Sequence, residues 1–306
     1  MRRAGGDYVL PVDKPVGPTS HDVVAIARRV LGNRRIGHSG TLDPFASGLL
    51  LLCVGQATRI AEFLSELDKC YLAVARLGVE TDTHDLDGQV VGEARDVDAV
   101  TAELVSTALE SFRGTIEQVP PQFSAKKVGG ESMHRRARRG ERVELEPVAV
   151  TVHSIELVDF SPPDVRLSVR CSSGTYIRAI ARDLGRSLGT GAHLTSLRRT
   201  AVGPFGSEEA VPLAAIDEPE AWQPAVIEPT RALAHLDSLE VDAEAVRRIR
   251  HGQRIRVSDP IGSGIGVETS AEGAGGSLVS VTCDGDLVAV AELDGGVLRP
   301  RKVFPA

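Results

Sequence analysis

The stretch GHSGTLDPFASGLLLLCVG, residues 37–55, places a single carboxylate, Asp43, between a loop of small residues and an apolar run. The unbroken apolar run, bounded by glycines, predicts a buried central strand over residues 48–55. Pro44 favours an extended backbone at Asp43, and the loop glycines would let a ligand approach the chain closely. The loop lacks the GKS or GKT of a P-loop, and its strand follows it instead of preceding it. Two interpretations are compatible with these residues alone: a simple turn ahead of a strand, or a carboxylate presented to a ligand.

The segments around this stretch alternate irregularly between strand and helix patterns. Strands are expected at 48–55, 69–78, 148–160 and 164–172, and helices at 19–32, 56–67, 96–114 and 174–189. In the first helix, Val23, Ala27, Val30 and Leu31 form the stripe that we expect to be buried. Irregular mixing of the two patterns predicts an α+β fold with a mixed β-sheet, not a regular βαβ repeat.

The length of 306 residues allows two domains. We expect a larger domain over residues 1–235 and a small β-rich domain over residues 236–306. The acidic, proline-bearing stretch 207–235 has the composition of a connection between domains. The basic segment 124–141 is expected to become ordered only with a partner, and the Gly-rich segment 258–278 to be a flexible insertion.

The composition excludes several classes of protein. Hydrophobic residues make up 42% of the chain, enough for a sizeable core, yet no apolar run approaches the length of a membrane span. The N-terminus has no apolar signal region, so we expect a soluble cytoplasmic protein. The four cysteines form no CxxC pair, which argues against a zinc site or a disulfide framework. His38, Asp43, His84 and Asp85 lack the spacing of a metal motif, so no metal is expected.

Charge is distributed unevenly along the chain. The net charge is −7, but residues 123–142 carry a local +5 and residues 166–199 a local +6. Residues 80–117 and 207–244 are in turn strongly acidic. A polarised surface of this kind, rich in arginine, favours a polyanionic partner.

Three of these arginines, Arg178, Arg182 and Arg186, are spaced four residues apart in a predicted helix. Like charges at that spacing are unfavourable, so anionic partners are expected for them. Such a partner could be a carboxylate such as Asp43, or a phosphate. A plain solvated basic face is the other interpretation.

Five motifs occur in a fixed order, and together they resemble a known family. They are DKPVGPTSHDVV (13–24), RRIGHSGTLDPFASGLLLLCVGQATR (34–59), KCYLAVARLGVETDTHDLDG (69–88), CSSGTYIRAIARDLG (171–185) and GAHLTSLRRTAVGPF (191–205). This set resembles the TruB family of bacterial tRNA pseudouridine-55 synthases, and the C-terminal part resembles a PUA-type RNA-binding domain more weakly. The resemblance implies a mixed β-sheet with flanking helices and a central cleft. It also implies that a monomer, without cofactor or metal, converts a uridine in the T-arm of tRNA to pseudouridine.

The resemblance also implies roles for individual residues. Asp43 would be the catalytic nucleophile, Tyr71 would stack on the target base, and Arg178 would pair with Asp43. His38 would hold the flipped nucleotide, and segment 124–141 would grip the RNA. The full set of implied substrate-binding residues is His38, Tyr71, Tyr176, Arg178, Leu197, Lys14, Arg59 and Asp85.

Two other functions stay open at this point. A hydrolase acting on nucleosides would need a second carboxylate, for which Asp82, Asp85 and Asp87 are the candidates nearest to a motif. A non-enzymatic tRNA-folding chaperone would need only the basic surfaces. Within the isomerase hypothesis, Asp43 could attack base C6 or ribose C1′, or abstract a proton in a glycal route, and the sequence does not choose among these.

Overall fold

The computed structural model describes residues 6–121, 127–128, 131–132, 145–257 and 276–305. The basic segment expected at 124–141 lies outside the described residues, apart from the short pair β8 (Lys127–Val128) and β9 (Glu131–Ser132). Nearly all of the Gly-rich segment expected at 258–278 also lies outside them.

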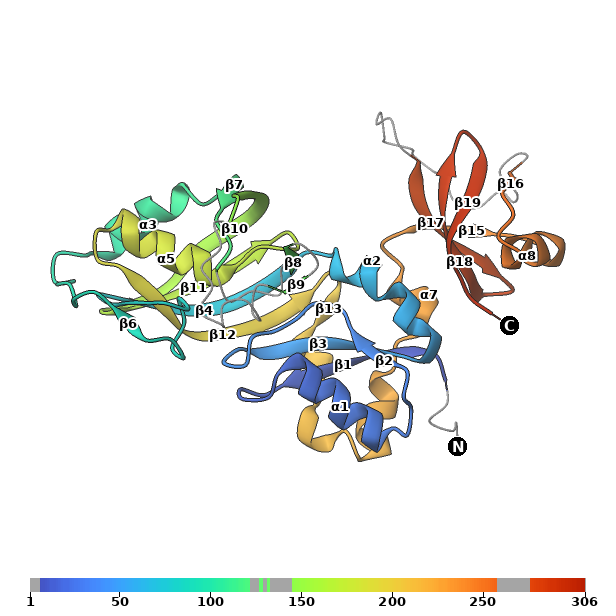
Figure 1. Cartoon of the computed structure of the whole chain (residues 1–306), viewed down its shortest axis with the longest axis horizontal. Helices are drawn as coiled ribbons and strands as arrows, with labels where there is room; N and C mark the ends of the chain where they lie inside the picture. The colour runs from blue at the N-terminus through green and yellow to red at the C-terminus, as the bar shows by residue number, and fades with distance from the viewer. Residues whose placement is uncertain (1–5, 122–126, 129–130, 133–144, 258–275, 306) are drawn as a thin grey trace.

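A ten-stranded mixed sheet forms the larger part of the molecule (Figure 1). Its strands in spatial order are β14 (Val211–Pro212), β1 (Tyr8–Lys14), β3 (Ser47–Val54), β12 (Ala192–Val202), β4 (Lys69–Leu77), β11 (Asp164–Cys171), β10 (Val148–Ser161) and β7 (Gly114–Gln118), with β2 (Ile36–His38) on β3 and β13 (Phe205–Gly206) on β12. The pairs β1–β14 and β3–β12 are parallel, and the other pairs are antiparallel. The predicted α+β class with a mixed sheet is therefore confirmed.

Short helices and one further strand pair decorate this sheet. They are α1 (Ser20–Val30), α2 (Ala61–Ser65), α3 (Ala102–Glu110), α5 (Ile177–Ser187), α6 (Pro219–Trp222), α7 (Pro229–Ala232), the 3₁₀ turns η1 (Gly55–Ile60), η2 (Ser207–Glu209), η3 (Leu213–Ala215) and η4 (Gln223–Ala225), and the pair β5 (Glu80–Thr81) and β6 (Val90–Val91). Helix α1 begins at a capping box between Thr19 and Asp22. The expected burial of Val30 is wrong, because it lies in the last turn of α1 and is 37% exposed. Within the described ranges, no helix is long and apolar enough to cross a membrane.

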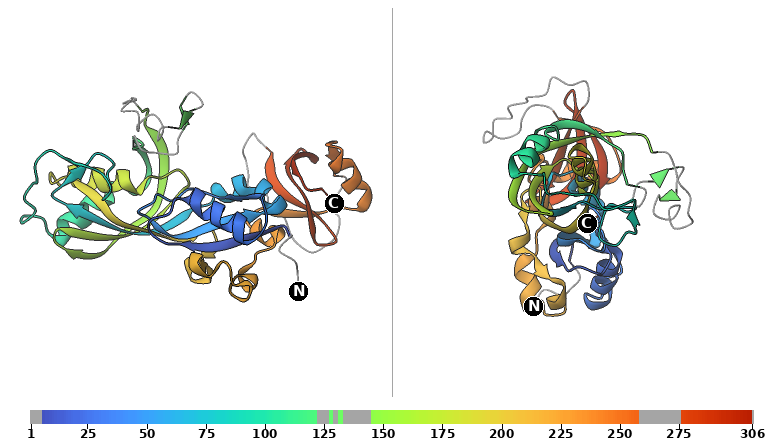
Figure 2. Two further views of the ribbon diagram at one scale, coloured as in Figure 1. Left: turned by 60° about the horizontal axis from the view of Figure 1, so that its bottom comes forward. Right: turned by 90° about the vertical axis from the view of Figure 1, so that its left-hand side faces the viewer.

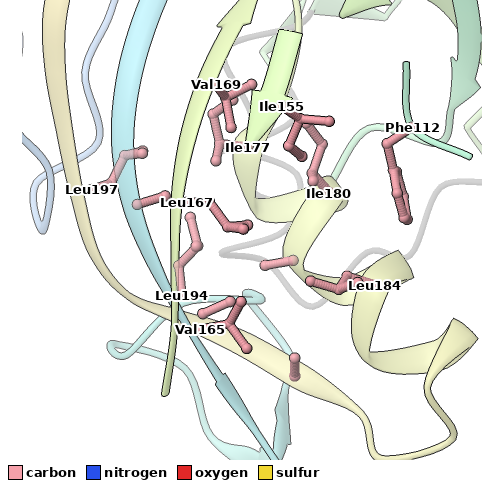
Figure 3. Close-up of a cluster of buried hydrophobic side chains, with 14 of the residues drawn as sticks. Phe112, Ile155, Val165, Leu167, Val169, Ile177, Ile180, Leu184, Leu194 and Leu197 are labelled. Carbon is pink, nitrogen blue, oxygen red and sulfur yellow. The ribbon is translucent and has the colours of Figure 1, made fainter. Parts of the chain in front are cut away.

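Helix α5 is anchored on the sheet by its apolar face (Figure 3). Ile177, Ile180 and Leu184 belong to one buried cluster with Leu167 and Val169 of β11. Burying a side chain of this size contributes about 1.5–3 kcal/mol. The start of α5, where Arg178 lies, is therefore fixed in position relative to the sheet.

The stretch 207–235, whose composition resembles a connection between domains, packs against the larger sheet. Its strand β14 pairs with β1, and the backbones of Ile227 and Val9 exchange two hydrogen bonds of 2.9 Å. Trp222 stacks on Tyr8 with ring centroids 5.9 Å apart. Apolar residues at the positions between the acidic ones make this packing possible. The prediction from charge did not take these apolar residues into account.

A second, five-stranded sheet follows and lies at one end of the first (Figures 1 and 2). Its order is β15 (Asp237–Glu240), β17 (Ser277–Cys283), β18 (Asp286–Asp294), β19 (Val297–Val303) and β16 (Ile255–Arg256), with helix α8 (Ala243–Arg250) beside it. Val290 and Phe304 join the hydrophobic cluster that contains Phe63 of α2, and Lys302 pairs with Glu62 at 2.7 Å. The two sheets thus share an apolar contact as well as a covalent connection.

The ten-stranded sheet is joined across its middle by a short contact. Strands β3 and β12 pair only through Ser47 with Arg198 and Gly48 with Arg199. Gly48 has φ +105°, and a Cβ atom there would overlap the backbone of Arg199. Because Asp43 lies just before β3, this contact also fixes one end of its loop.

Replacing Gly48 by alanine should therefore destabilise the protein by at least about 2 kcal/mol, through strain and backbone overlap. Gly37→Ala is the matched control, since the atom nearest to a Cβ there is 3.9 Å away. We expect the control to stay within about 1 kcal/mol of the wild type in urea unfolding. Equal stability of the two variants would contradict this account of the contact.

Candidate active site

The loop that carries Asp43 connects β2 to β3 and is held on both sides of that residue. The Ser20 hydroxyl accepts a hydrogen bond from the Leu42 amide at 2.9 Å and donates one to the Leu42 carbonyl at 3.2 Å. The Pro44 carbonyl accepts a hydrogen bond from the Gly17 amide at 2.9 Å. The start of α1 and the turn after β1 therefore fix the backbone around Asp43.

The Asp43 carboxylate is gripped at two points by Arg178. The Nε atom lies 3.0 Å from Oδ2, and Nη2 donates to Oδ1 at 3.2 Å. The Arg178 side chain is 5% exposed, whereas that of Asp43 is 34% exposed. A two-point contact of this kind fixes the plane of the carboxylate, and part of it still faces solvent.

The outer nitrogen of Arg178 binds a second acidic segment. Its Nη1 atom donates to Asp85 Oδ2 at 3.2 Å and to the Thr83 carbonyl at 3.0 Å. The Asp85 carboxylate also accepts hydrogen bonds from the Thr83 hydroxyl and from the Asp87 amide. Burial raises the pKa of Asp85, while these hydrogen bonds and the charge of Arg178 act in the opposite direction. Asp85 thus supports Arg178 from behind and is closed to a ligand.

Tyr71 and Leu197 lie on neighbouring strands near Asp43. Tyr71 of β4 is half-buried against the cluster that contains Leu197 of β12 and Leu42 of the loop. Burial raises the pKa of the Tyr71 hydroxyl, and the charge of Asp43 adds to this. The structure therefore places an aromatic ring and an apolar side chain in the cluster that includes Leu42, the residue before Asp43.

His38 ends β2, a few residues before Asp43. Its ring meets that of His21 edge-on, with centroids 5.5 Å apart, and its buried Nδ1 atom has no hydrogen-bond partner among the described residues. Burial lowers the pKa of His38 to about 4, with smaller contributions from His21 and Arg199. The ring is therefore neutral near pH 7.

Two of the expected site residues, Lys14 and Arg59, differ in how close they lie to Asp43. The buried Lys14 ammonium donates to the carbonyls of Pro15 and Pro18, each at 2.8 Å, and of Pro44 at 3.4 Å, so it ties two turns together. Burial lowers the pKa of Lys14 to about 8, and the nearby charge of Asp43 opposes the shift. Arg59 bonds to Gln56 at 3.1 Å beyond the far end of β3. An eight-residue strand spans about 26 Å, so the structure does not bring Arg59 to Asp43.

Tyr176 precedes α5 and is held through its backbone. Its amide donates to Gln118 Oε1 at 3.0 Å, and Gln118 Nε2 donates to its carbonyl at 3.3 Å. Gln118 is 1% exposed and was not identified from the sequence. A lone glutamine at a strand end carries no signal that would have distinguished it.

Two of the three arginines of the α5 ladder, Arg178 and Arg182, are buried, so the ladder is not a fully solvated basic face. Arg182 is 6% exposed; it binds both Asp183 oxygens, at 2.7 and 2.9 Å, and the Val119 carbonyl at 3.2 Å. Arg186 is exposed and lies 3.5 Å from Glu80. The partners of this ladder in the structure are carboxylates and carbonyls of the chain itself.

Arg199 was also overlooked as a residue of this site. It is 1% exposed and donates to the carbonyls of Gly40, Thr41 and Leu49. The sequence spacing could have identified Arg199. Residues two apart on a strand lie on the same face, and Leu197 was expected in the pocket.

Two models of known protein families match this chain. The family described as "TruB family pseudouridylate synthase (N terminal domain)" matches residues 28–177, and "tRNA pseudouridylate synthase B C-terminal domain" matches residues 178–237. The first match contains the Asp43 loop and Asp85. Arg178 opens the second match.

Curated relatives extend the similarity to nearly the whole chain. Proteins named tRNA pseudouridine synthase B from Gloeobacter violaceus and Burkholderia mallei are each 43% identical, covering 97% and 99% of this chain and 98% of each relative. One solved chain, from an H/ACA RNP bound to a substrate RNA containing 2′-deoxyuridine, has a TM-score of 0.73, is 27% identical, and is similar over 98% of this chain and 85% of its own length. Another, from an archaeal box H/ACA sRNP Nop10–Cbf5 complex, has a TM-score of 0.73, is 26% identical, and is similar over 99% of this chain and 87% of its own length. The fold, the Asp43 site and these matches lead to one conclusion: the chain belongs to the TruB family of pseudouridylate synthases.

Proposed function

We propose that this protein converts a uridine in the T-loop of tRNA, at position 55, to pseudouridine, with Asp43 as the nucleophile. The observation that carries the proposal is a carboxylate held at two points by a buried arginine while its side chain stays 34% exposed. The names of the curated relatives support tRNA as the substrate, and the RNA-bound structural neighbour supports RNA binding by this fold. We further propose that the protein acts as a monomer on the T-arm.

The proposed reaction is an isomerisation within one nucleotide. The bond between ribose C1′ and base N1 breaks, a bond between C1′ and C5 forms, C5 loses its proton, and N1 gains one. Asp43 would act by attack at base C6, by attack at C1′, or by removing a proton in a glycal route. Each route needs a carboxylate held in a fixed orientation, and the two contacts from Arg178 supply that orientation.

The surroundings of Asp43 suit a base removed from its stack. Extruding a base costs about a few kcal/mol, and stacking on an aromatic side chain offsets part of that cost. Tyr71 is the ring proposed for stacking, Leu197 contributes an apolar contact, and Tyr176 is proposed to contact the base. The neutral ring of His38 is proposed to help hold the flipped nucleotide.

The hydrolase alternative is weakened by the position of Asp85. A glycoside-type mechanism needs a second carboxylate that reaches the substrate. The Asp85 side chain is 7% exposed, and its oxygens are bonded to Arg178, Thr83 and Asp87. We therefore propose that Asp85 positions Arg178 and takes no direct part in bond breaking.

The second sheet and α8, within residues 236–306, are proposed to bind RNA backbone, as a PUA-like domain would. The exposed arginines near α8 are Arg247, Arg248, Arg250, Arg254 and Arg256, and none forms an ion pair with a described residue. Arginines without acidic partners are available to phosphates. Segment 124–141 is proposed as a second contact with RNA on the basis of its charge.

The central test replaces the nucleophile. Asp43→Asn should lower the single-turnover rate of pseudouridine formation in a T-arm RNA by more than about 10³-fold, because the amide cannot act as the nucleophile. RNA affinity should change little. Pseudouridine formation that survives this substitution would contradict the proposed mechanism. Release of free uracil by the wild type would support a hydrolase, and RNA folding without modification would support a chaperone.

Asp85→Asn should slow the same reaction by roughly 10- to 100-fold, because Arg178 would lose a charged partner and shift against Asp43. Asp87→Asn is the matched control, since that side chain lies on the exposed side of the same loop. Single-turnover kinetics at saturating RNA distinguish the two variants. A normal rate for Asp85→Asn would remove the positioning role.

Replacing Arg247, Arg250 and Arg254 together by glutamine should weaken tRNA binding and reduce its salt dependence by up to about three units of slope. The rate at saturating RNA should stay unchanged. The control replaces Arg299 and Arg301, which lie on β19 of the second sheet and pair with Asp294 and Glu292. Equal effects of the two sets would argue against α8 as a phosphate-binding surface.

A further inference from the structure

Arg199 is a fully buried cation directly beneath the Asp43 loop. Its Nε atom donates to the Leu49 carbonyl at 2.7 Å, Nη2 to the Gly40 carbonyl at 3.1 Å, and Nη1 to the Thr41 carbonyl at 3.4 Å. These carbonyls lie on both sides of Asp43 in the sequence. One side chain on β12 thus holds the start of the loop and the strand that follows it.

The charge of Arg199 has no acidic partner among the described residues. Its neighbour Arg198 points to the opposite face of the same strand and binds both oxygens of Asp13, at 3.0 and 2.8 Å. A guanidinium buried with carbonyl partners alone costs free energy relative to a well-packed neutral side chain. Stability by itself therefore does not account for an arginine at this position.

The influence of Arg199 reaches other groups of the site. Arg199 lies directly opposite Tyr71 in the β12–β4 pair, so their side chains share one face of the sheet. The charge of Arg199 opposes the rise in the pKa of Tyr71 that burial causes. The charge also adds to burial in lowering the pKa of His38. The same side chain that holds the loop thus lies on the strand face beside the ring proposed to stack on the base.

We propose that Arg199 is a positioning residue of the reaction, whose planar fork of donors sets the Asp43 loop in one arrangement relative to the sheet and to Tyr71 on the neighbouring strand. This inference rests on the proposed function. A lysine would keep the charge at this position, but its single ammonium cannot bind three carbonyls in a fixed geometry. Catalysis depends on such geometry more steeply than folding does, since a misplacement of about 1 Å can cost about 10²-fold in rate.

The test compares Arg199→Lys and Arg199→Gln with the wild type on a T-arm RNA. Arg199→Gln, which loses both fork and charge, should lower the single-turnover rate by about 10²-fold or more, and Arg199→Lys by about tenfold. The Kd for RNA should stay within about threefold in both, because the side chain is 1% exposed and does not reach the surface. Arg198→Gln is the matched control and should keep the wild-type rate.

A second control distinguishes a purely structural role of Arg199 from a positioning role in the reaction. Leu64→Ala removes a fully buried side chain in α2, away from the loop, and lowers stability without touching Asp43. All rates are measured well below the melting temperature of each variant. The proposal is overturned if Arg199→Gln keeps more than half of the wild-type rate, if its loss is matched by Leu64→Ala, or if the loss lies in the Kd. If Arg199→Gln does not fold, Arg199→Lys decides, and a wild-type rate for that variant overturns the proposal.

Different results would contradict the proposed function and the role of Arg199. A wild-type protein that makes no pseudouridine removes the proposed function. A wild type that makes pseudouridine, an inactive Asp43→Asn and fully active Arg199 variants would remove only the positioning role of Arg199.

Discussion

The buried guanidinium of Arg178 is the interaction on which the site depends. It joins three segments that are far apart in the chain: the Asp43 loop, the Thr83–Asp85 turn and the start of α5. An arginine in the first turn of a helix is disfavoured by the helix dipole, so its position needs carboxylate partners. The apolar face of α5 holds the backbone, and the two carboxylates determine where the charged end lies. Asp43 is thereby oriented before any substrate arrives.

A second constraint lies beneath the same loop. The two halves of the large sheet meet through a short parallel contact at Gly48 and Arg199. A side chain at position 48 would overlap the backbone of Arg199. The Arg199 side chain then extends under the loop to bind its carbonyls. The site therefore lies where only two residue pairs join the two halves of the sheet. A distortion of the backbone at that contact would displace Asp43.

Much of the fold follows from local patterns in the sequence. The apolar run after Asp43 is a central strand, and the pattern of Ile177, Ile180 and Leu184 predicts the face by which α5 packs. The packing of 207–235 was missed, because its acidic residues hide apolar ones that dock on β1. The site residues were predicted mainly from the ordered motifs. These motifs could not show that the Lys14 ammonium is bound by backbone carbonyls, or that Arg59 lies beyond the far end of β3 from Asp43. Gln118 and Arg199 act through backbone groups, which leave no pattern of side-chain types in the sequence.

The most direct test of this account is a double-mutant cycle between Arg178 and Asp85 on the single-turnover rate of pseudouridine formation. If Asp85 acts through Arg178, Asp85→Asn should slow the wild type strongly and slow Arg178→Lys far less, because the contact is already lost. An equal factor in both backgrounds would show that the two residues act independently. That result would contradict the claim that one buried arginine, held from behind, positions the reactive carboxylate.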